Sequence, residues 1–182
     1  MSRIIAVFLL IILIPLFVII GLVIYYEDGG PIFFIQKRFG KNNSFFNIYK
    51  FRTMKNNTPD LATHLLQNPE TFLLRVGFIL RKLSLDELPN IINIAKGEMV
   101  FVGPRPALYN QYDLISLRVE SGIDKLSPGI TGWAQINGRD DITINEKIEL
   151  EKEYLKKRSY FFDLVILIRT FLSIFSGKGI VH

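Results

Sequence analysis

An uncharged apolar run extends from Ile4 to Tyr26. At about 1.5 Å per residue, a helix over this run is long enough to reach across the hydrocarbon core of a bilayer. A cleavable secretory signal has a shorter apolar region followed by a small-residue cleavage site, and neither feature is visible here. The sequence therefore predicts a membrane segment over residues 1–28, followed by a separate region over residues 29–182.

Pro15 stands at the middle of this run, where it removes one backbone donor and predicts a kink or a break. Basic residues flank the run on both sides, with Arg3 before it and Lys37, Arg38 and Lys41 after it. The positive-inside rule then places both flanks in the cytoplasm, which a re-entrant hairpin satisfies. A proline-kinked single span is the alternative, because membrane helices tolerate proline.

Composition narrows the chemistry that the rest of the chain can support. The 182 residues include no cysteine, which excludes disulfides and thiolate chemistry. The two histidines, His64 and His182, are too few for a histidine-rich metal site, so oxygen ligands and a magnesium or manganese ion are favoured. The net charge of +5 is modest and does not indicate nucleic-acid binding.

Two adjacent carboxylates, Asp86 and Glu87, are the best clue to chemistry. Ser84 has the character of a helix N-cap, with Glu87 three residues later as in a capping box, and the helix is predicted to end at Lys96-Gly97. In a first helical turn, both carboxylates can meet a phosphate and a divalent cation. The alternative is that they only stabilise the helix N-terminus, as acidic residues do in any first turn.

A strand pair is predicted over 32–36 and 45–52, because both segments are rich in aromatic residues and a short polar loop joins them. Lys50 and Arg52 are two residues apart and therefore share a face of the second strand. They are candidates for a cationic wall that binds phosphates. Solvated charges on an edge strand are the alternative.

Arg105 lies between two prolines, after a short strand predicted over 99–102. The following proline biases the backbone of Arg105 to an extended conformation, and a fixed guanidinium suits bidentate phosphate binding. A proline turn with an exposed arginine is the alternative interpretation.

A glycine-rich segment over 127–139 can bring its backbone close to a ligand, and its polar residues include Gln135 and Arg139. The neighbouring Asp140 and Asp141 form a rival carboxylate pair. We interpret this second pair as part of a hydrated turn.

Three further helices are predicted. The first covers 72–83 and is expected to bury one apolar face, made of Phe72, Val76, Ile79, Leu80 and Leu83. A charged helix over 145–158 precedes an apolar one over 160–175, which Asp163 and Arg169 interrupt. Those charges argue against a second span, and the basic residues beside it suit a helix in the interface of an anionic membrane. An ordinary amphipathic core helix is the alternative.

Together these features predict an α+β fold in a small membrane-associated domain. Residues 1–28 are predicted to form an N-terminal re-entrant membrane helix that Pro15 breaks. Residues 29–182 are predicted to form a catalytic domain with a short β-hairpin and interfacial amphipathic helices, one of them C-terminal.

Several short motifs occur in one order along the chain: Lys50-Phe-Arg-Thr-Met54, Leu83-Ser-Leu-Asp-Glu-Leu-Pro89, Lys96-Gly-Glu-Met99, Gly103-Pro-Arg-Pro106 and Pro128-Gly-Ile-Thr-Gly-Trp-Ala-Gln-Ile-Asn-Gly-Arg139. With the proline-broken N-terminus, they closely resemble the bacterial sugar transferase family, the small monotopic phosphoglycosyl transferases. The resemblance covers nearly the whole chain. The chain departs from the family in having Ile14-Pro15 at the membrane break, where the family commonly has Ser-Pro, and Glu98 and Val100 in place of the usual aspartate and serine.

The resemblance implies a transferase at the cytoplasmic face of the bacterial inner membrane. It would pass a phosphosugar from a UDP-sugar to undecaprenyl phosphate, giving undecaprenyl-diphospho-sugar and UMP as the first step of glycoconjugate assembly. Carried to this chain, the family roles make Asp86 the nucleophile and Glu87 a ligand of Mg2+, or of Mn2+. Lys50 and Arg105 become phosphate contacts, and Arg52, Gln135 and Arg139 join them as candidate substrate-binding residues.

The implied partners are the UDP-sugar, undecaprenyl phosphate and membrane lipids, with downstream glycosyltransferases as further candidates. A catalytically inactive membrane scaffold, or a nucleotide-sugar-binding regulator of a glycan assembly complex, is the alternative.

Overall fold

The computed structural model describes residues 2–59, 68–138 and 142–176. The helices are α1 (Ser2–Asp28), α2 (Arg75–Lys82), α3 (Asn90–Lys96), α4 (Tyr112–Glu120), α5 (Trp133–Gly138), α6 (Ile144–Lys157) and α7 (Tyr160–Ser176). The strands are β1 (Phe33–Phe39), β2 (Phe45–Phe51), β3 (Val100–Val102) and β4 (Gly129–Thr131). Short 3-10 turns add η1 (Lys41–Asn43), η3 (Pro69–Phe72), η4 (Leu85–Glu87) and η5 (Ile123–Lys125). The predicted mixture of helices and sheet is therefore confirmed.

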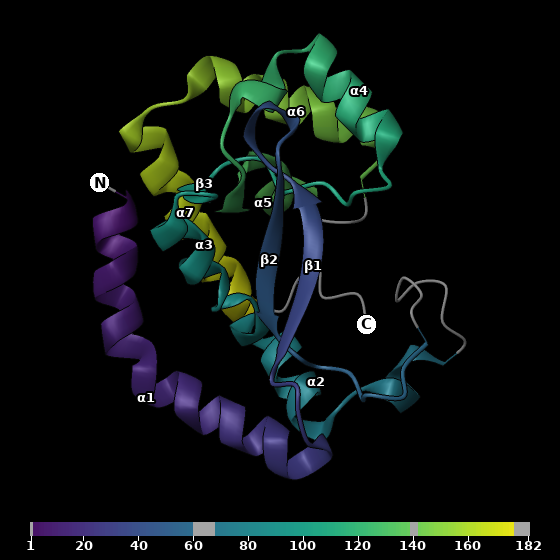
Figure 1. Ribbon diagram of the computed structural model, residues 1–182. Helices are drawn as coiled ribbons and strands as arrows, with labels where there is room; N and C mark the ends of the chain where they lie inside the picture. Colours follow the sequence, from purple (N-terminus) through teal and green to yellow (C-terminus); the bar gives the residue numbers. More distant parts are fainter. Residues whose placement is uncertain (1, 60–67, 139–141, 177–182) are drawn as a thin grey trace.

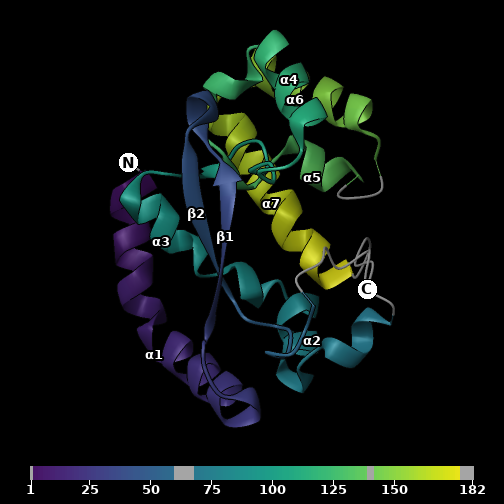
Figure 2. The same ribbon diagram turned by 45° about the vertical axis from the view of Figure 1, so that its right-hand side comes forward.

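Helix α1 bends near its middle and lies along one side of the molecule (Figures 1 and 2). Pro15 is inside this helix, and a proline removes one backbone hydrogen bond and crowds the preceding turn. Among the described residues, α1 is the one helix long and apolar enough to cross a membrane, judged by its length and composition.

One face of α1 packs on the rest of the chain along its whole length. Its first half meets α3, β2 and the start of β3 through Ala6, which is fully buried against a cluster that includes Ile48, Ile91, Ile94 and Met99. Its second half meets a separate cluster through Ile20 and Ile24, whose partners include Phe51, Leu74 and Leu80. The opposite face is apolar and exposed, at Ile4, Phe8, Ile11, Ile12, Val18, Ile19 and Leu22.

The predicted hairpin is confirmed by the antiparallel pairing of β1 with β2, in which Phe34 lies opposite Lys50 and Arg38 lies opposite Phe46. In both views the hairpin runs from the end of the molecule that carries α2 to the end that carries α4 and α6 (Figures 1 and 2). It therefore links the two ends of the domain.

A second, parallel sheet pairs β3 with β4, with Val100 opposite Gly129 and Val102 opposite Thr131. The sequence predicts β3 but not β4, which lies inside the glycine-rich segment. Glycine is needed here because the chains approach closely: a Cβ on Gly103 would lie 2.4 Å from the Ser127 carbonyl oxygen.

The predicted capping box at Ser84 is wrong. Ser84 has a left-handed backbone, with φ of 54°, and its side chain caps no backbone N–H among the described residues. Leu85–Glu87 form the 3-10 turn η4, and α3 begins only at Asn90. The predicted end of this helix is confirmed, because Gly97 follows Lys96 with φ of 84°, as a left-handed C-cap.

The predicted buried face of the 72–83 helix is only partly correct. Leu80 is buried, but Ile79 and Leu83 are 54% and 44% exposed. The cause is Gly77, which lies so close to the backbone of Thr53 that a Cβ would come within 2.2 Å of its carbonyl oxygen. Gly77 and Leu80 therefore set the inward face of α2, and the larger apolar residues turn outward.

Helices α6 and α7 agree with the predicted C-terminal pair. A capping box joins Thr143 to Glu146 at the start of α6. In α7, Ile166 is fully buried, whereas apolar residues on another face are exposed: Tyr160, Phe161, Leu164, Ile168, Phe171 and Leu172. Its charged residues face inner partners, since Asp163 accepts a hydrogen bond from the Tyr154 hydroxyl (2.8 Å) and Arg169 lies over the Trp133 ring (5.4 Å).

Candidate active site

Glu87 lies between two cations that come from distant parts of the chain. The Lys50 ammonium on β2 is 2.6 Å from Glu87 Oε1, and the Arg105 guanidinium is 3.1 Å from the same oxygen. Burial alone would raise the pKa of Glu87, but the charges and hydrogen bonds of Lys50 and Arg105 outweigh it and lower this pKa well below its usual range. Glu87 is therefore a fixed carboxylate at neutral pH.

Asp86, the neighbour of Glu87 in η4, is shifted in the opposite direction. Burial raises the pKa of the Asp86 carboxyl, and the adjacent Glu87 charge raises it further, while Lys50 and Arg81 act against this rise. Two adjacent carboxylates with pKa values moved apart are typical of a site where they have different roles.

A small pocket opens beside Glu87 and is lined by two polar residues that the sequence motifs did not single out as site residues, Arg38 and Asn90. Its other lining residues include Lys50, Glu87, Arg105, Pro106 and Ile130. The pocket thus joins β1, β2, η4, α3 and the segment around Arg105.

Arg38 is held at the pocket by two hydrogen bonds, from one guanidinium nitrogen to the Pro106 carbonyl (3.1 Å) and from the other to Gln36 Oε1 (2.6 Å). Burial and the nearby Arg105 charge lower the pKa of Arg38 to about 10, although Glu87 acts to raise it. From the sequence, Arg38 was interpreted only as a basic residue that follows the apolar run and bears on topology. The signal in the sequence was that Gln36 and Arg38 are two residues apart and so lie on the same face of β1.

Asn90 is 1% exposed, and its Oδ1 has no hydrogen-bond partner among the described residues. Buried polar atoms are almost always paired, so an unpaired acceptor at a pocket indicates that a ligand, ion or water completes it. The signal in the sequence was a polar side chain directly after Pro89, at the first position of the helix.

The backbone of Arg105 is held by a buried ion pair. Arg118 of α4 donates a hydrogen bond to the Arg105 carbonyl (2.9 Å) and, through Nε, another to Glu151 Oε2 on α6 (2.8 Å). Arg118 and Glu151 are both buried. Through this chain of contacts, α4 and α6 fix the segment that carries the Arg105 guanidinium.

Replacing Glu151 by glutamine should lower the free energy of unfolding by about 3–5 kcal/mol, because it leaves the buried Arg118 charge without a counterion. Thermal unfolding in detergent measures the effect. The matched control is Glu149→Gln on the same helix, where Glu149 pairs with Lys152 at the surface. Its expected cost is about 0–1 kcal/mol. Equal costs for the two variants would contradict a structural role for the buried pair.

The remaining predicted residues are not all at the pocket. Arg52 contacts the end of α1 instead of Glu87, with a 2.6 Å ion pair to Asp28. Gln135 of α5 reaches the pocket wall indirectly, because its amide donates a hydrogen bond to the carbonyl of Ile130 (2.9 Å). Arg139, together with the rival pair Asp140 and Asp141 and with His64, lies outside the described residues.

The oxygen ligands at the site are few. Within the described ranges, no group of three or more His, Cys, Asp or Glu residues is close enough to hold a metal ion. The carboxylates of Asp86 and Glu87 and the buried amide of Asn90 offer oxygen only, which suits a hard divalent cation that takes its other ligands from phosphate and water. The arrangement as a whole can bind an anionic phosphate between Lys50 and Arg105 beside a carboxylate.

Known proteins resemble this chain over most of its length. It is 41% identical to an uncharacterized sugar transferase of Bacillus subtilis over 158 residues, which cover 87% of this chain and 77% of that protein. It is 36% identical to an exopolysaccharide production protein of Rhizobium meliloti, with 91% of this chain and 79% of that one covered. It is also 36% identical to the UDP-glucose:undecaprenyl-phosphate glucose-1-phosphate transferase of Escherichia coli, over 94% of this chain but 38% of that longer protein.

The family comparison agrees with these relatives. Residues 1–177 match the bacterial sugar transferase family, so the match includes α1, both carboxylates of η4, the Arg105 segment and the glycine-rich segment. This chain is therefore an enzyme of the bacterial sugar transferase family.

Proposed function

We propose that this enzyme transfers a phosphosugar from a UDP-sugar to undecaprenyl phosphate and so begins the assembly of a polysaccharide or related glycoconjugate. The observation that carries the proposal is the turn η4, where Asp86 stands next to a Glu87 carboxylate held between Lys50 and Arg105. The name of the Escherichia coli relative, which includes both UDP-glucose and undecaprenyl phosphate, supports the substrate classes.

The reaction proceeds in two steps at phosphorus. In the first, a carboxylate oxygen of Asp86 attacks the β-phosphorus of the UDP-sugar, the bond to the bridging oxygen breaks, and UMP leaves with that oxygen. In the second, a phosphate oxygen of undecaprenyl phosphate attacks the same phosphorus, and the Asp86 carboxylate leaves unchanged. The raised pKa of Asp86 supports this role, because a more basic carboxylate is a better nucleophile once it is ionised.

The cations of the site reduce the repulsion between an anionic nucleophile and an anionic diphosphate. Lys50 and Arg105 already contact Glu87 and bind the phosphates beside it, and Arg38 adds a third positive charge at the pocket. Gln135 supports the pocket wall through Ile130. Arg139 stays a proposed substrate contact, whereas Arg52 has its contacts at Asp28.

A divalent cation fits this set of ligands, and we assign it to Glu87 with Mg2+ as the natural ion and Mn2+ as a substitute. Both cationic contacts of Glu87 go to Oε1. When bound, such an ion supplies positive charge to the diphosphate and to the leaving UMP. Glu87 holds the ion, and the neighbouring Asp86 is left for attack.

We further propose that α1 is re-entrant, and that the enzyme works at the cytoplasmic face of the bacterial inner membrane. The support is the packing of both halves of α1 against one domain, since a helix crossing to the far side would carry one half away from it. The exposed apolar residues of α7 are then placed to rest in the interface of the same leaflet.

Topology gives a direct prediction. Single cysteines at Ser2 and Lys41 should both resist a membrane-impermeant thiol reagent in intact cells, because both flanks are cytoplasmic in a re-entrant arrangement. The chain has no cysteine of its own, so the background is clean. Permeabilised cells give the positive control. Selective labelling at position 2 would instead establish a single span.

The activity itself is tested by transfer of a labelled phosphosugar from a panel of UDP-sugars to undecaprenyl phosphate. Product with any donor supports the proposal and identifies the sugar. An inactive scaffold would neither bind donor nor form product. A regulator would bind donor without turnover, which equilibrium binding of the UDP-sugar distinguishes.

A further inference from the structure

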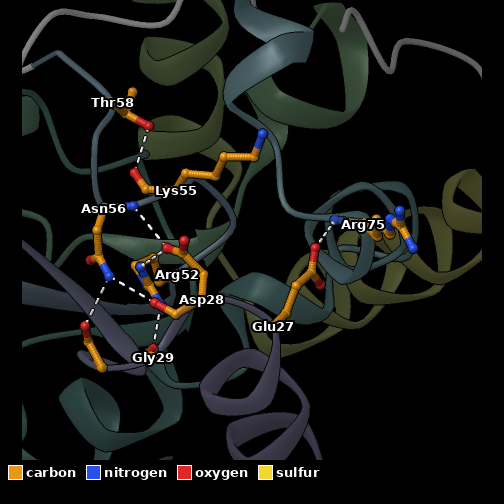
Figure 3. Close-up of polar contacts among 9 residues, drawn as sticks. Glu27, Asp28, Gly29, Arg52, Lys55, Asn56, Thr58 and Arg75 are labelled. Carbon is orange, nitrogen blue, oxygen red and sulfur yellow. Dashed lines mark hydrogen bonds and ion pairs between the residues drawn. The ribbon is translucent and has the colours of Figure 1, made fainter.

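The end of α1 carries two acidic residues, Glu27 and Asp28, which we call the acidic pair. Both side chains contact the catalytic domain, at different places (Figure 3). The membrane helix and the domain are thus joined by polar contacts at the point where the helix ends.

Asp28 contacts the segment that directly follows β2. Its Oδ2 accepts hydrogen bonds from the Arg52 guanidinium (2.6 Å) and from the Asn56 backbone N–H (2.9 Å). The Asn56 amide also donates to the carbonyls of Asp28 (2.8 Å) and Gly30 (3.0 Å), and Arg52 donates to the Gly29 carbonyl. Arg52 is 6% exposed, so its charge depends on this contact for compensation.

Glu27 contacts the start of α2. Its carboxylate accepts hydrogen bonds from the backbone N–H groups of Arg75 and Val76, the latter at 3.1 Å. The N-cap residue of α2 is Leu74, which has no side-chain acceptor to offer. Glu27 therefore caps this helix from a different part of the chain, and a carboxylate at a helix N-terminus is favoured by its free donors and its dipole.

The two segments that the acidic pair contacts lie next to active-site residues in the chain. Lys50 is two residues before Arg52 in the chain, and α2 leads directly into η4 with Asp86 and Glu87. A hydrogen bond from Arg81 Nε to Thr53 Oγ1 (3.0 Å) joins these elements to each other. Any tilt of α1 against the domain therefore acts on the active site through both elements together.

We propose that Glu27 and Asp28 are positioning residues that set the height of the active site above the membrane. They would thereby affect the step with the lipid substrate and not the step with the UDP-sugar. This inference rests on the proposed function. A UDP-sugar arrives from water, and its reaction with Asp86 needs no fixed height. The phosphate of a polyprenyl lipid is confined to the headgroup region, and it reaches the phosphorylated Asp86 only if the site lies at that level.

The test uses the full chain in liposomes and separates the two half-reactions. The double variant Glu27→Gln with Asp28→Asn removes both charges with little change in shape. The matched control is Asp113→Asn with Glu149→Gln, which makes the same change of net charge at exposed positions on α4 and α6. A single cysteine in place of the exposed Lys82 carries a spin label. The ratio of the label's accessibility to oxygen and to a water-soluble nickel complex reports its depth in the membrane.

We expect the double variant to exchange labelled UMP into UDP-sugar at a rate within about twofold of the unchanged chain. Its transfer to undecaprenyl phosphate should fall roughly tenfold, because a misplacement of reacting groups by about 1 Å can cost up to roughly 100-fold. The depth of the label should change as well. The variant Asn56→Ala removes only the two side-chain hydrogen bonds to the carbonyls of Asp28 and Gly30, so it should shift depth and transfer in the same direction by less.

Two outcomes would overturn the inference. Equal losses in both half-reactions, with a lower melting temperature and an unchanged depth, would make the acidic pair a purely stabilising contact. Unchanged transfer and depth in both variants would show that other contacts set the height. If the unchanged chain itself neither exchanges UMP nor transfers sugar, the proposed function fails, and the depth of the label still decides whether the acidic pair sets the height.

Discussion

Replacing Asp86 by asparagine should abolish the release of UMP from a UDP-sugar in the absence of any polyprenyl phosphate. The unchanged enzyme should release up to about one equivalent of UMP, gain the mass of a phosphosugar, and exchange labelled UMP back into the donor, because a covalent first step is reversible. An amide is a poor nucleophile and cannot form the same acyl phosphate. Intact-protein mass spectrometry and the exchange assay measure the two signals.

Asp113→Asn is the matched control, since Asp113 is exposed on α4 and distant in sequence from η4. The pH dependence gives a second measure of the same step. Because the pKa of Asp86 is raised, the attacking carboxylate is lost as the pH falls through that raised value, and the exchange rate falls with it. Lipid product formation by the unchanged enzyme without adduct or exchange would assign Asp86 to metal binding or to general-base work.

Replacing Glu87 by glutamine should lower the transfer rate by roughly 100-fold or more, if electrostatic stabilisation at the site supplies a few kcal/mol. Glutamine keeps the shape of the side chain but removes the charge that holds Lys50 and Arg105 together. It also removes the proposed ligand of the divalent cation. Steady-state transfer with saturating donor and acceptor is the measurement.

Excess EDTA should abolish the activity of the unchanged enzyme, and added Mg2+ or Mn2+ should restore it. Full activity in EDTA would refute the assignment of a metal ion to Glu87. The substitutions Asp140→Asn and Asp141→Asn should have far smaller effects than Glu87→Gln. The reverse ranking would mean that the second carboxylate pair is the catalytic one.

Local patterns in the sequence were sufficient to predict the hairpin and the end of α3. The hairpin follows from two aromatic-rich segments around a polar loop, and the helix end follows from Gly97, which adopts the left-handed backbone that a C-cap needs. The capping box failed because Ser84 itself adopts a left-handed backbone, and a motif of residue types does not encode that angle.

The parts of the site that could not be predicted depend on contacts between distant segments. Arg38 and Asn90 meet Glu87 only after the hairpin, η4 and α3 have packed together. Arg52 is two residues after Lys50, the spacing of neighbours on one face of a strand. Its ion-pair partner is nevertheless Asp28 at the end of α1. Similarly, the outward turn of Ile79 follows from the close approach of Gly77 to Thr53, which no helical periodicity reveals.

The packing of α1 along the whole domain also bears on the order in which the protein folds, because translation proceeds from the N-terminus. The ribosome releases α1 first, whereas its partners on β2, α2 and α3 are translated later. During that interval the face that will meet Ile94 and Leu80 has no protein partner, and in the membrane placement proposed above the bilayer is the apolar solvent available to it. If α1 enters the bilayer as we propose, folding of the later segments displaces lipid from this face, and the core of the enzyme is completed at the membrane surface.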